Sequence, residues 1–171
     1  MSSPMRALPK VHIVSACIGG LTLARCLRKK RIKAIISEEN ASPARHNYGI
    51  SLKPQAYRAL LNLVQLDEST FCQQVVVDAT RGGGGQVNPR NLTRSSAPKD
   101  LSSPFRAHRR RLEALLQEKL EIKWGHMLED ITSYESEHFL SFKKKDNIHT
   151  RFIIYLESTP QSGSPYCLDH N

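Results

Sequence analysis

The sequence predicts an α/β fold, and three observations near its N-terminal end support that prediction. A β-branched apolar run at Val11–Val14 leads into a turn of small residues at 15–20. Apolar residues at helical spacing follow over 21–27, and a second apolar run at 34–36 ends at the acidic Glu38. The order strand, tight turn, helix, strand and acid is that of the first βαβ unit of a Rossmann-like, dinucleotide-binding fold.

The turn between the strand and the helix departs from the glycine pattern of that fold. The pattern places three glycines where this chain has Ser15, Cys17 and Gly20. The first glycine allows the tight turn, the second leaves room for a diphosphate, and the third lets helix and strand pack closely. We expect Ser15 to be tolerated and Cys17 to project into the diphosphate position. A positive φ at Cys17 would cost about 1–2 kcal/mol in addition. The expected nucleotide-binding loop is Ser15, Ala16, Cys17, Ile18, Gly19 and Gly20.

The acidic pair Glu38 and Glu39 closes the second predicted strand. An acid about 20 residues beyond the turn accepts hydrogen bonds from a ribose hydroxyl in this fold. Such an acid suits an unphosphorylated ribose and disfavours a 2′-phosphate. A solvated carboxylate at a strand end is the simpler interpretation, and only the spacing favours ribose binding.

Composition narrows the function classes. The chain has 171 residues, a net charge of +9 and an apolar share of 39%, which fits one globular domain with an anionic ligand. The basic clusters lack interleaved aromatic residues, so single-stranded nucleic acid is disfavoured as a partner. No secretory signal, membrane-spanning run, paired-cysteine motif or metal-ligand spacing is visible. These features predict a cytoplasmic protein with reduced cysteines and no metal.

The rest of the chain predicts further elements and three regions. We expect a short extended run at 48–52, a helix at 56–66, a strand at 71–77, a flexible loop at 81–104 and a helix at 109–120. Strands at 121–126, 129–134 and 138–143 predict an antiparallel β-meander inserted before a final strand at 151–156. The expected regions are a disordered N-terminus (1–10), a Rossmann-like domain (11–158) and a loose tail (159–171).

Four segments resemble the N-terminal half of the FAD-dependent monooxygenases of the para-hydroxybenzoate hydroxylase type, a group with many fungal aromatic hydroxylases. The first segment is VHIVSACIGGLTLARCL with the following AIISEE, and the second is ARHNYGISLKPQAYRALLNLVQLDE. The third is FRAHRRRLEALLQEKL, which is similar to the family's Arg-x-x-Leu helix start, and the fourth is RFIIYLESTPQS. The resemblance runs from Val11 to about Ser162.

The resemblance implies an FAD-binding domain and several cofactor contacts. It places Gly19, Gly20 and Glu38 along the adenosine and diphosphate of FAD, and Arg109 and Arg45 near the rest of the cofactor. At the fourth segment the family has a strand ending in Gly-x-Asp-Gly, where this chain has Tyr155, Glu157 and Ser158. The cofactor contact expected at Glu157 is therefore altered relative to the family.

The resemblance also implies a chemistry. Members of the family hydroxylate small molecules with NAD(P)H and O2. The family's second flavin motif, Gly-Asp-Ala, and its substrate-binding sheet have no counterpart in this sequence, so the predicted domain is incomplete and its activity weakened or absent. The sequence assigns no catalytic residue, substrate or oligomeric state. Two alternatives stay open: a non-enzymatic degenerate scaffold or interaction protein, and an NAD-dependent dehydrogenase-like domain, because FAD and NAD share the βαβ unit.

Overall fold

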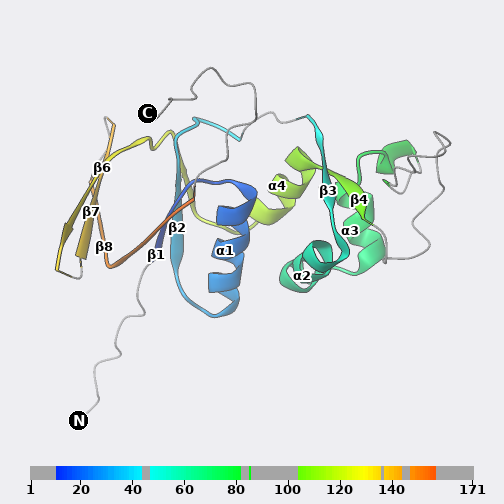
Figure 1. Cartoon of the computed structure of the whole chain (residues 1–171), viewed down its shortest axis with the longest axis horizontal. Helices are drawn as coiled ribbons and strands as arrows, with labels where there is room; N and C mark the ends of the chain where they lie inside the picture. The colour runs from blue at the N-terminus through cyan, green and yellow to red at the C-terminus, as the bar shows by residue number, and fades with distance from the viewer. Residues whose placement is uncertain are drawn as a thin grey trace, which may run out of the picture.

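The computed structural model describes residues 11–43, 47–81, 85, 104–135, 137–143 and 147–156. Several predicted features lie outside those residues: the N-terminus at 1–10, most of the loop at 81–104, the tail at 159–171, and the two site residues Arg45 and Glu157. The described part is a mixed α/β structure with a parallel sheet and two separate antiparallel sheets (Figure 1). Nowhere in it does a helix have the length and apolar character needed to cross a bilayer.

The predicted βαβ unit is confirmed. Strand β1 (Val11–Val14) and strand β2 (Ala34–Glu38) pair in parallel, and helix α1 (Ile18–Lys29) connects them. Strands β5 (Ile122–Trp124) and β9 (Phe152–Tyr155) extend the parallel sheet on either side, in the order β5-β2-β1-β9. Ile13 and Ile36 of the sheet and Leu21 of α1 are buried together, because the apolar faces of both layers meet there.

A second group of elements lies beside α1. Strand β3 (Gly49–Leu52) pairs in antiparallel fashion with strand β4 (Phe105–His108). Three α-helices and one short 3₁₀ helix accompany this pair, namely α2 (Pro54–Val64), α3 (Glu68–Val75), α4 (Arg109–Gln117) and η1 (Ala79–Arg81). The core of this group is aromatic, with the ring centroid of Phe105 at 5.1 Å from that of Tyr57 and 6.3 Å from that of Phe71.

The strand expected at 71–77 is wrong, because helix α3 occupies most of that segment. The strand was expected from a run rich in valine at its C-terminal end. The segment instead begins with a helix cap, since the Asp67 carboxylate accepts a 2.9 Å hydrogen bond from the backbone N–H of Thr70. Phe71 and Val75, four residues apart, are both fully buried on one helix face. The cap and this spacing outweigh the β propensity.

The antiparallel meander exists, but one of its strands differs from the prediction. It contains β6 (Leu128–Tyr134), β7 (Glu137–Phe142) and β8 (Ile148–Thr150). The predicted strand at 121–126 instead forms β5 of the parallel sheet, where Ile122 and Trp124 pack on the hydrophobic core. Phe142 of β7 holds the meander against the sheet, with its ring centroid 5.9 Å from that of His12.

Two arginines of α1 donate hydrogen bonds to backbone carbonyls at the C-terminal end of α4 and just beyond it. The guanidinium of Arg25 donates to the backbone carbonyls of Leu115 and Leu116, at 2.5 and 2.9 Å, and Arg28 donates to the carbonyl of Lys119 at 2.7 Å. The last carbonyls of a helix lack partners within the helix, and cations stabilise that end. These contacts fix α4 beside α1, and so set the distance between the two helices that border the site.

Candidate functional site

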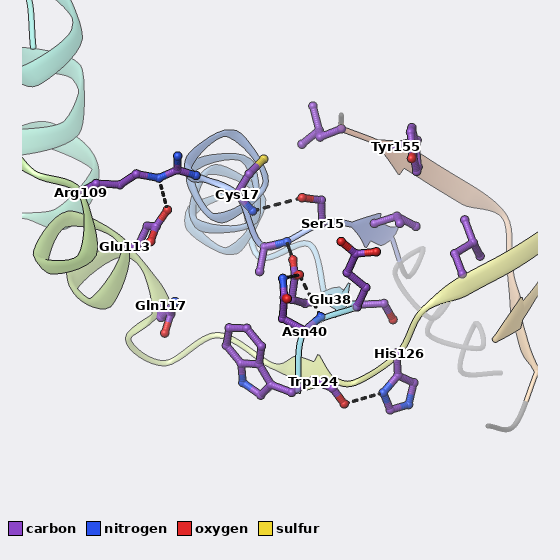
Figure 2. Close-up of a pocket in the computed structure, with 16 residues that line it drawn as sticks. Ser15, Cys17, Glu38, Asn40, Arg109, Glu113, Gln117, Trp124, His126 and Tyr155 are labelled. Carbon is purple, nitrogen blue, oxygen red and sulfur yellow. Dashed lines mark hydrogen bonds and ion pairs between the residues drawn. The ribbon is translucent and has the colours of Figure 1, made fainter. Parts of the chain in front are cut away.

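A cavity of about 370 Å³ opens where the parallel strands β1 and β2 end, between the N-terminus of α1 and one face of α4 (Figure 2). In open α/β sheets, ligands bind outside the carboxyl ends of the strands. The volume falls within the range of small-molecule sites. Its lining residues are Val14, Ser15, Ala16, Cys17, Ser37, Glu38, Glu39, Asn40, Arg109, Glu113, Gln117, Trp124, His126, Leu128, Tyr155 and Leu156.

The turn into α1 requires glycine at one position. A β-carbon on Gly20 would lie 2.2 Å from the backbone carbonyl oxygen of Ser15 and 3.4 Å from the side chain of Ile13. A carbonyl oxygen of the main chain cannot move away cheaply, so only glycine allows the helix to start this close to the strand. A β-carbon on Gly19 would make only ordinary contacts, at 3.7 Å from the Cys17 sulfur. The close packing expected at Gly20 is therefore present.

Backbone strain in this turn lies at Ser15 and not at Cys17. Ser15 has a φ of 96°, in the region that favours glycine, whereas Cys17 has a φ of −65° and a ψ of 168°, which any residue adopts. The expected backbone penalty at Cys17 is thus absent and belongs to Ser15. The Cys17 side chain borders the cavity at the first turn of α1 (Figure 2). Its backbone N–H donates to the Ser15 hydroxyl at 3.3 Å.

Glu38 ends β2 and is 9% exposed. Its Oε2 accepts a 2.8 Å hydrogen bond from the backbone N–H of Ala16. Its Oε1 accepts hydrogen bonds from the Asn40 backbone N–H at 3.2 Å and side-chain amide at 2.6 Å. The carboxylate is therefore held in one orientation at the cavity edge. Each oxygen carries two lone pairs, so capacity to accept from a ligand hydroxyl remains. Glu39 is exposed and also borders the cavity.

Helix α4 contributes a polar face to the opposite wall. Arg109, Glu113 and Gln117 are spaced four residues apart, and all three border the cavity (Figure 2). The Nε of Arg109 donates to Glu113 at 2.7 Å, and the guanidinium also hydrogen-bonds to the Tyr48 hydroxyl and lies over its ring. The arginines at the N-terminal end of α4 predict a nearby anion. The carboxylate of Glu113, on the same helix, is such an anion.

The structure brings together some of the predicted site residues and not others. Ser15, Ala16, Cys17, Glu38, Glu39 and Arg109 line one cavity, with Gly19 and Gly20 at the start of α1 beside it. Ile18 lines a different groove, between α1 and α2. Sequence reasoning missed Glu113 and Gln117, which the four-residue spacing from Arg109 could have revealed. It also missed Trp124, because its position at the cavity depends on the pairing of β5 with β2. Among the described residues, no three potential metal-ligand side chains cluster.

Two curated fungal proteins show sequence similarity to the chain. The FAD-dependent monooxygenase adaC of Aspergillus niger is 24% identical over 174 residues, which cover 95% of this chain and 42% of adaC. The FAD-dependent monooxygenase nscC of Neosartorya fischeri is 29% identical over 135 residues, covering 71% of this chain and 33% of nscC. The chain thus spans less than half the length of these relatives. No protein-family model matches it.

Solved structures share the fold at low sequence identity. FqzB superposes with a TM-score of 0.66 and 14% identity, covering 92% of this chain and 38% of FqzB. HpxO of Klebsiella pneumoniae, solved in complex with FAD, superposes with a TM-score of 0.61 and 16% identity, covering 85% of this chain and 38% of HpxO. The sequence similarity shows that the chain is a homologue of proteins named FAD-dependent monooxygenases, and the superpositions show that it shares the α/β fold of the solved structures.

Proposed function

We propose that the chain binds FAD through its ADP half, in the cavity between α1 and α4. The observation that carries the proposal is the position of Glu38, beside the N-terminal turn of α1 and linked to it through Ala16. A helix N-terminus offers unpaired N–H groups and a partial positive charge to a diphosphate. An acid at the end of the neighbouring strand accepts from a ribose hydroxyl. Both features border the same cavity.

The residues of the cavity are compatible with bound FAD, but their charges limit the attraction for its diphosphate. Gly20 keeps the first turn of α1 packed closely against the strand. Cys17 places a side chain at that turn. Among the described residues that line the cavity, Arg109 is the one lysine or arginine, and it is paired with Glu113. Glu38 and Glu39 add negative charge nearby. Attraction for a diphosphate therefore rests mainly on the helix terminus, and we infer weak FAD binding.

The activity that we propose is inferred from the names of the relatives. A bound flavin supplies the redox chemistry, and the protein supplies orientation and a site protected from water. We infer that this domain belongs to the chemistry in which a small organic substrate is hydroxylated with NAD(P)H and O2. The residues of this chain would hold the cofactor, and no catalytic residue is assigned to them.

A titration with FAD tests the proposal directly. Binding should quench flavin fluorescence and raise its anisotropy, and ADP should compete for the site. FMN, which lacks the ADP half, should not bind, and NAD should compete only through its own ADP half. FAD that remains fully free at high protein concentration, or FMN that binds as well as FAD, would overturn the proposal.

A degenerate scaffold without cofactor is the second candidate. It is favoured by the non-glycine residue at the left-handed position Ser15, and by the internal pairing of Arg109 with Glu113. On that interpretation the fold persists, while the cavity no longer holds a nucleotide at cellular concentrations. Glycine substitutions at Ser15 and Cys17 distinguish FAD binding from a scaffold without cofactor.

A further inference from the structure

We propose that the groove between α1 and α2 binds a linear fatty carboxylate, with the alkyl chain between the two helices and the carboxylate at Lys29 and Lys30. The two helices lie side by side (Figure 1), and the groove has a volume of about 500 Å³, within the range of small-molecule sites. Among the described residues, none lines both this groove and the cavity at α4. The inference is therefore independent of FAD binding.

The walls of the groove are apolar along most of its length. Leu52 and Leu60 line it and are 8% and 7% exposed, and Ile18 and Leu63 line it half-buried. Thr22 also lines it, but the Thr22 hydroxyl donates a 2.6 Å hydrogen bond to the Ile18 carbonyl of the same helix. Such walls offer close contacts to a hydrocarbon chain and few hydrogen bonds to a polar ligand.

Small side chains on α2 leave the space between the helices open. Ala56 and Ala59 lie three residues apart on one helix face, and both line the groove while remaining exposed. On α1 the lining residues run from Ile18 to Lys30. Between Ile18 and Lys29 an α-helix rises about 17 Å, which is close to the length of an extended dodecyl chain. The groove thus suits an unbranched chain of that size.

The groove is basic at one end. The ammonium of Lys29 donates a 3.2 Å hydrogen bond to the backbone carbonyl of Asn62, so the C-terminal ends of α1 and α2 meet there. An ammonium has three donors, so donors remain at Lys29 for a ligand. Lys30 lines the same end, and no aspartate or glutamate lines the groove in the described part of the chain. An apolar slot with cations at one end matches a long-chain carboxylate.

The charge balance at this end favours an anion. Each helix C-terminus carries about half an elementary negative charge, and the two lysine ammonium groups together exceed that sum. Both lysines are exposed, so an ion pair with them contributes little to affinity. Burial of the alkyl chain therefore supplies most of the binding free energy. The lysines set the orientation of the ligand and its preference for a negative head group.

A calorimetric titration of the full chain with monomeric dodecanoate tests the site. Each methylene that lies in the groove should raise affinity about two- to fourfold, so hexanoate should bind more than about fiftyfold more weakly. Dodecyltrimethylammonium, which has the same chain and the opposite charge, should bind about fivefold more weakly than dodecanoate. Dodecanoate should leave FAD affinity unchanged. No binding of dodecanoate, or equal affinity for the two head groups, would overturn the proposal.

A substitution that fills the groove tests the position of the alkyl chain. Ala59→Phe should weaken dodecanoate about tenfold or more, because the ring takes the place of several methylenes. Ala59 is exposed, so the larger side chain meets no closed core. Gln55→Phe, at an exposed position of α2 outside the groove, is the matched control and should bind as the unmodified protein does. Equal losses in both variants would contradict binding in the groove.

A second pair of variants tests the position of the carboxylate. Lys29→Gln combined with Lys30→Gln should weaken dodecanoate about fivefold and strengthen dodecyltrimethylammonium, a reversal that damage to the groove would not produce. Lys53→Gln, at the exposed N-cap of α2, removes a charge outside the groove and should change neither affinity. An equal effect of Lys53→Gln would mean that net charge alone attracts the ligand, and would overturn the assignment of the carboxylate.

Three further outcomes would assign the groove to another occupant and overturn the proposal. The first is binding to phosphatidylglycerol vesicles by a protein that does not bind monomeric dodecanoate. The second is a dimer, detected by sedimentation, that Ala59→Phe dissociates. The third is displacement of FAD by dodecanoate, which would place the chain in the cavity at α4. If Ala59→Phe does not fold, judged by circular dichroism, the chain-length series and the lysine variants decide.

Discussion

The carboxylate of Glu38 accepts a hydrogen bond from the backbone N–H of Ala16, and this 2.8 Å contact joins the end of β2 to the turn before α1. Asn40 holds the other oxygen of the same carboxylate through its backbone and side-chain amides. Glu38 is therefore more than a solvated acid at a strand end. It fixes the shape of the cavity edge before any ligand arrives, so its removal should affect stability as well as binding.

Glu38→Gln should lower both the free energy of unfolding and the affinity for FAD. A glutamine keeps one oxygen for Ala16, but its NH2 group cannot accept from Asn40, so two hydrogen bonds to a charged oxygen are lost. The expected loss of stability is about 1–3 kcal/mol, measured by urea denaturation. Glu39→Gln, at the exposed neighbouring position, is the control and should unfold as the unmodified protein does. Equal stability of both variants would show that the Asn40 contacts contribute nothing.

Gly20→Ala and Gly19→Ala should have opposite effects, although the glycines are adjacent. A β-carbon at Gly20 meets the Ser15 carbonyl oxygen at 2.2 Å, so the turn must shift, at a cost of about 1–3 kcal/mol. A β-carbon at Gly19 makes only ordinary contacts, and alanine stabilises a helix by roughly 0.5–1 kcal/mol over glycine. Thermal unfolding of the two variants should show a lower Tm for Gly20→Ala and a higher Tm for Gly19→Ala. A stable Gly20→Ala would contradict the close approach of α1 to β1.

The sequence predicted those parts of the fold whose signal is local. The apolar spacing of α1 and α4 and the β-branched run of β1 each lie within one segment, so periodicity was sufficient. The segment of α3 was misassigned because its valines favour a strand, and the cap at Asp67 decides only when Phe71 and Val75 become buried. Propensity is a weak signal when tertiary burial opposes it.

The side of the candidate site that lies in the βαβ unit was predictable from the residues themselves, whereas on the opposite wall only Arg109 was expected, from the resemblance. The turn at 15–20 and Glu38 belong to a single βαβ unit with fixed spacing, so sequence alone placed them together. Trp124 and Gln117 reach the cavity through the pairing of β5 with β2 and the packing of α4 beside α1. Such contacts join segments far apart in the chain. The spacing from Arg109 places Gln117 on one face of α4, but no local pattern places Trp124 at the cavity. The strain at Ser15 was likewise assigned to Cys17, because spacing does not reveal φ.

The pH dependence of stability should carry a contribution from Asp67. Side-chain and backbone hydrogen bonds from Thr70 hold the pKa of the Asp67 carboxyl below its usual value of 3.8. A carboxyl with a lowered folded-state pKa stabilises the fold above its unfolded pKa, and that stabilisation is lost as the pH falls through the folded value. Asp67→Asn keeps the helix cap and does not titrate.

Asp67→Asn should therefore lose less stability than the unmodified protein when the pH falls from about 5 to about 2. Urea midpoints measured across that interval give the comparison. Glu129→Gln, at an exposed position of β6, is the control and should follow the unmodified curve. Parallel curves for Asp67→Asn and the unmodified protein would mean that the cap does not lower this pKa.

Ser15→Gly and Cys17→Gly should separate backbone strain from access to the diphosphate position. Ser15 has the positive φ, so glycine there should raise the free energy of unfolding by up to about 1 kcal/mol and leave FAD affinity almost unchanged. Cys17 has an ordinary φ, so glycine there should cost up to about 1 kcal/mol of stability, because it adds conformational entropy to the unfolded chain. Removal of its side chain from the first turn of α1 should raise FAD affinity about tenfold, a gain of roughly 1.4 kcal/mol.

Cys17→Ser is the matched control for this pair, because serine keeps the β-carbon and a polar atom of similar reach. Serine is also a good helix N-cap, so this variant should be at least as stable as the unmodified protein and gain no FAD affinity. Flavin anisotropy and urea denaturation on all three variants give both quantities. If affinity rises in Ser15→Gly and not in Cys17→Gly, the limiting defect is the strained turn. If it rises in neither, the glycine turn does not limit binding, and the pairing of Arg109 with Glu113 becomes the next feature to vary.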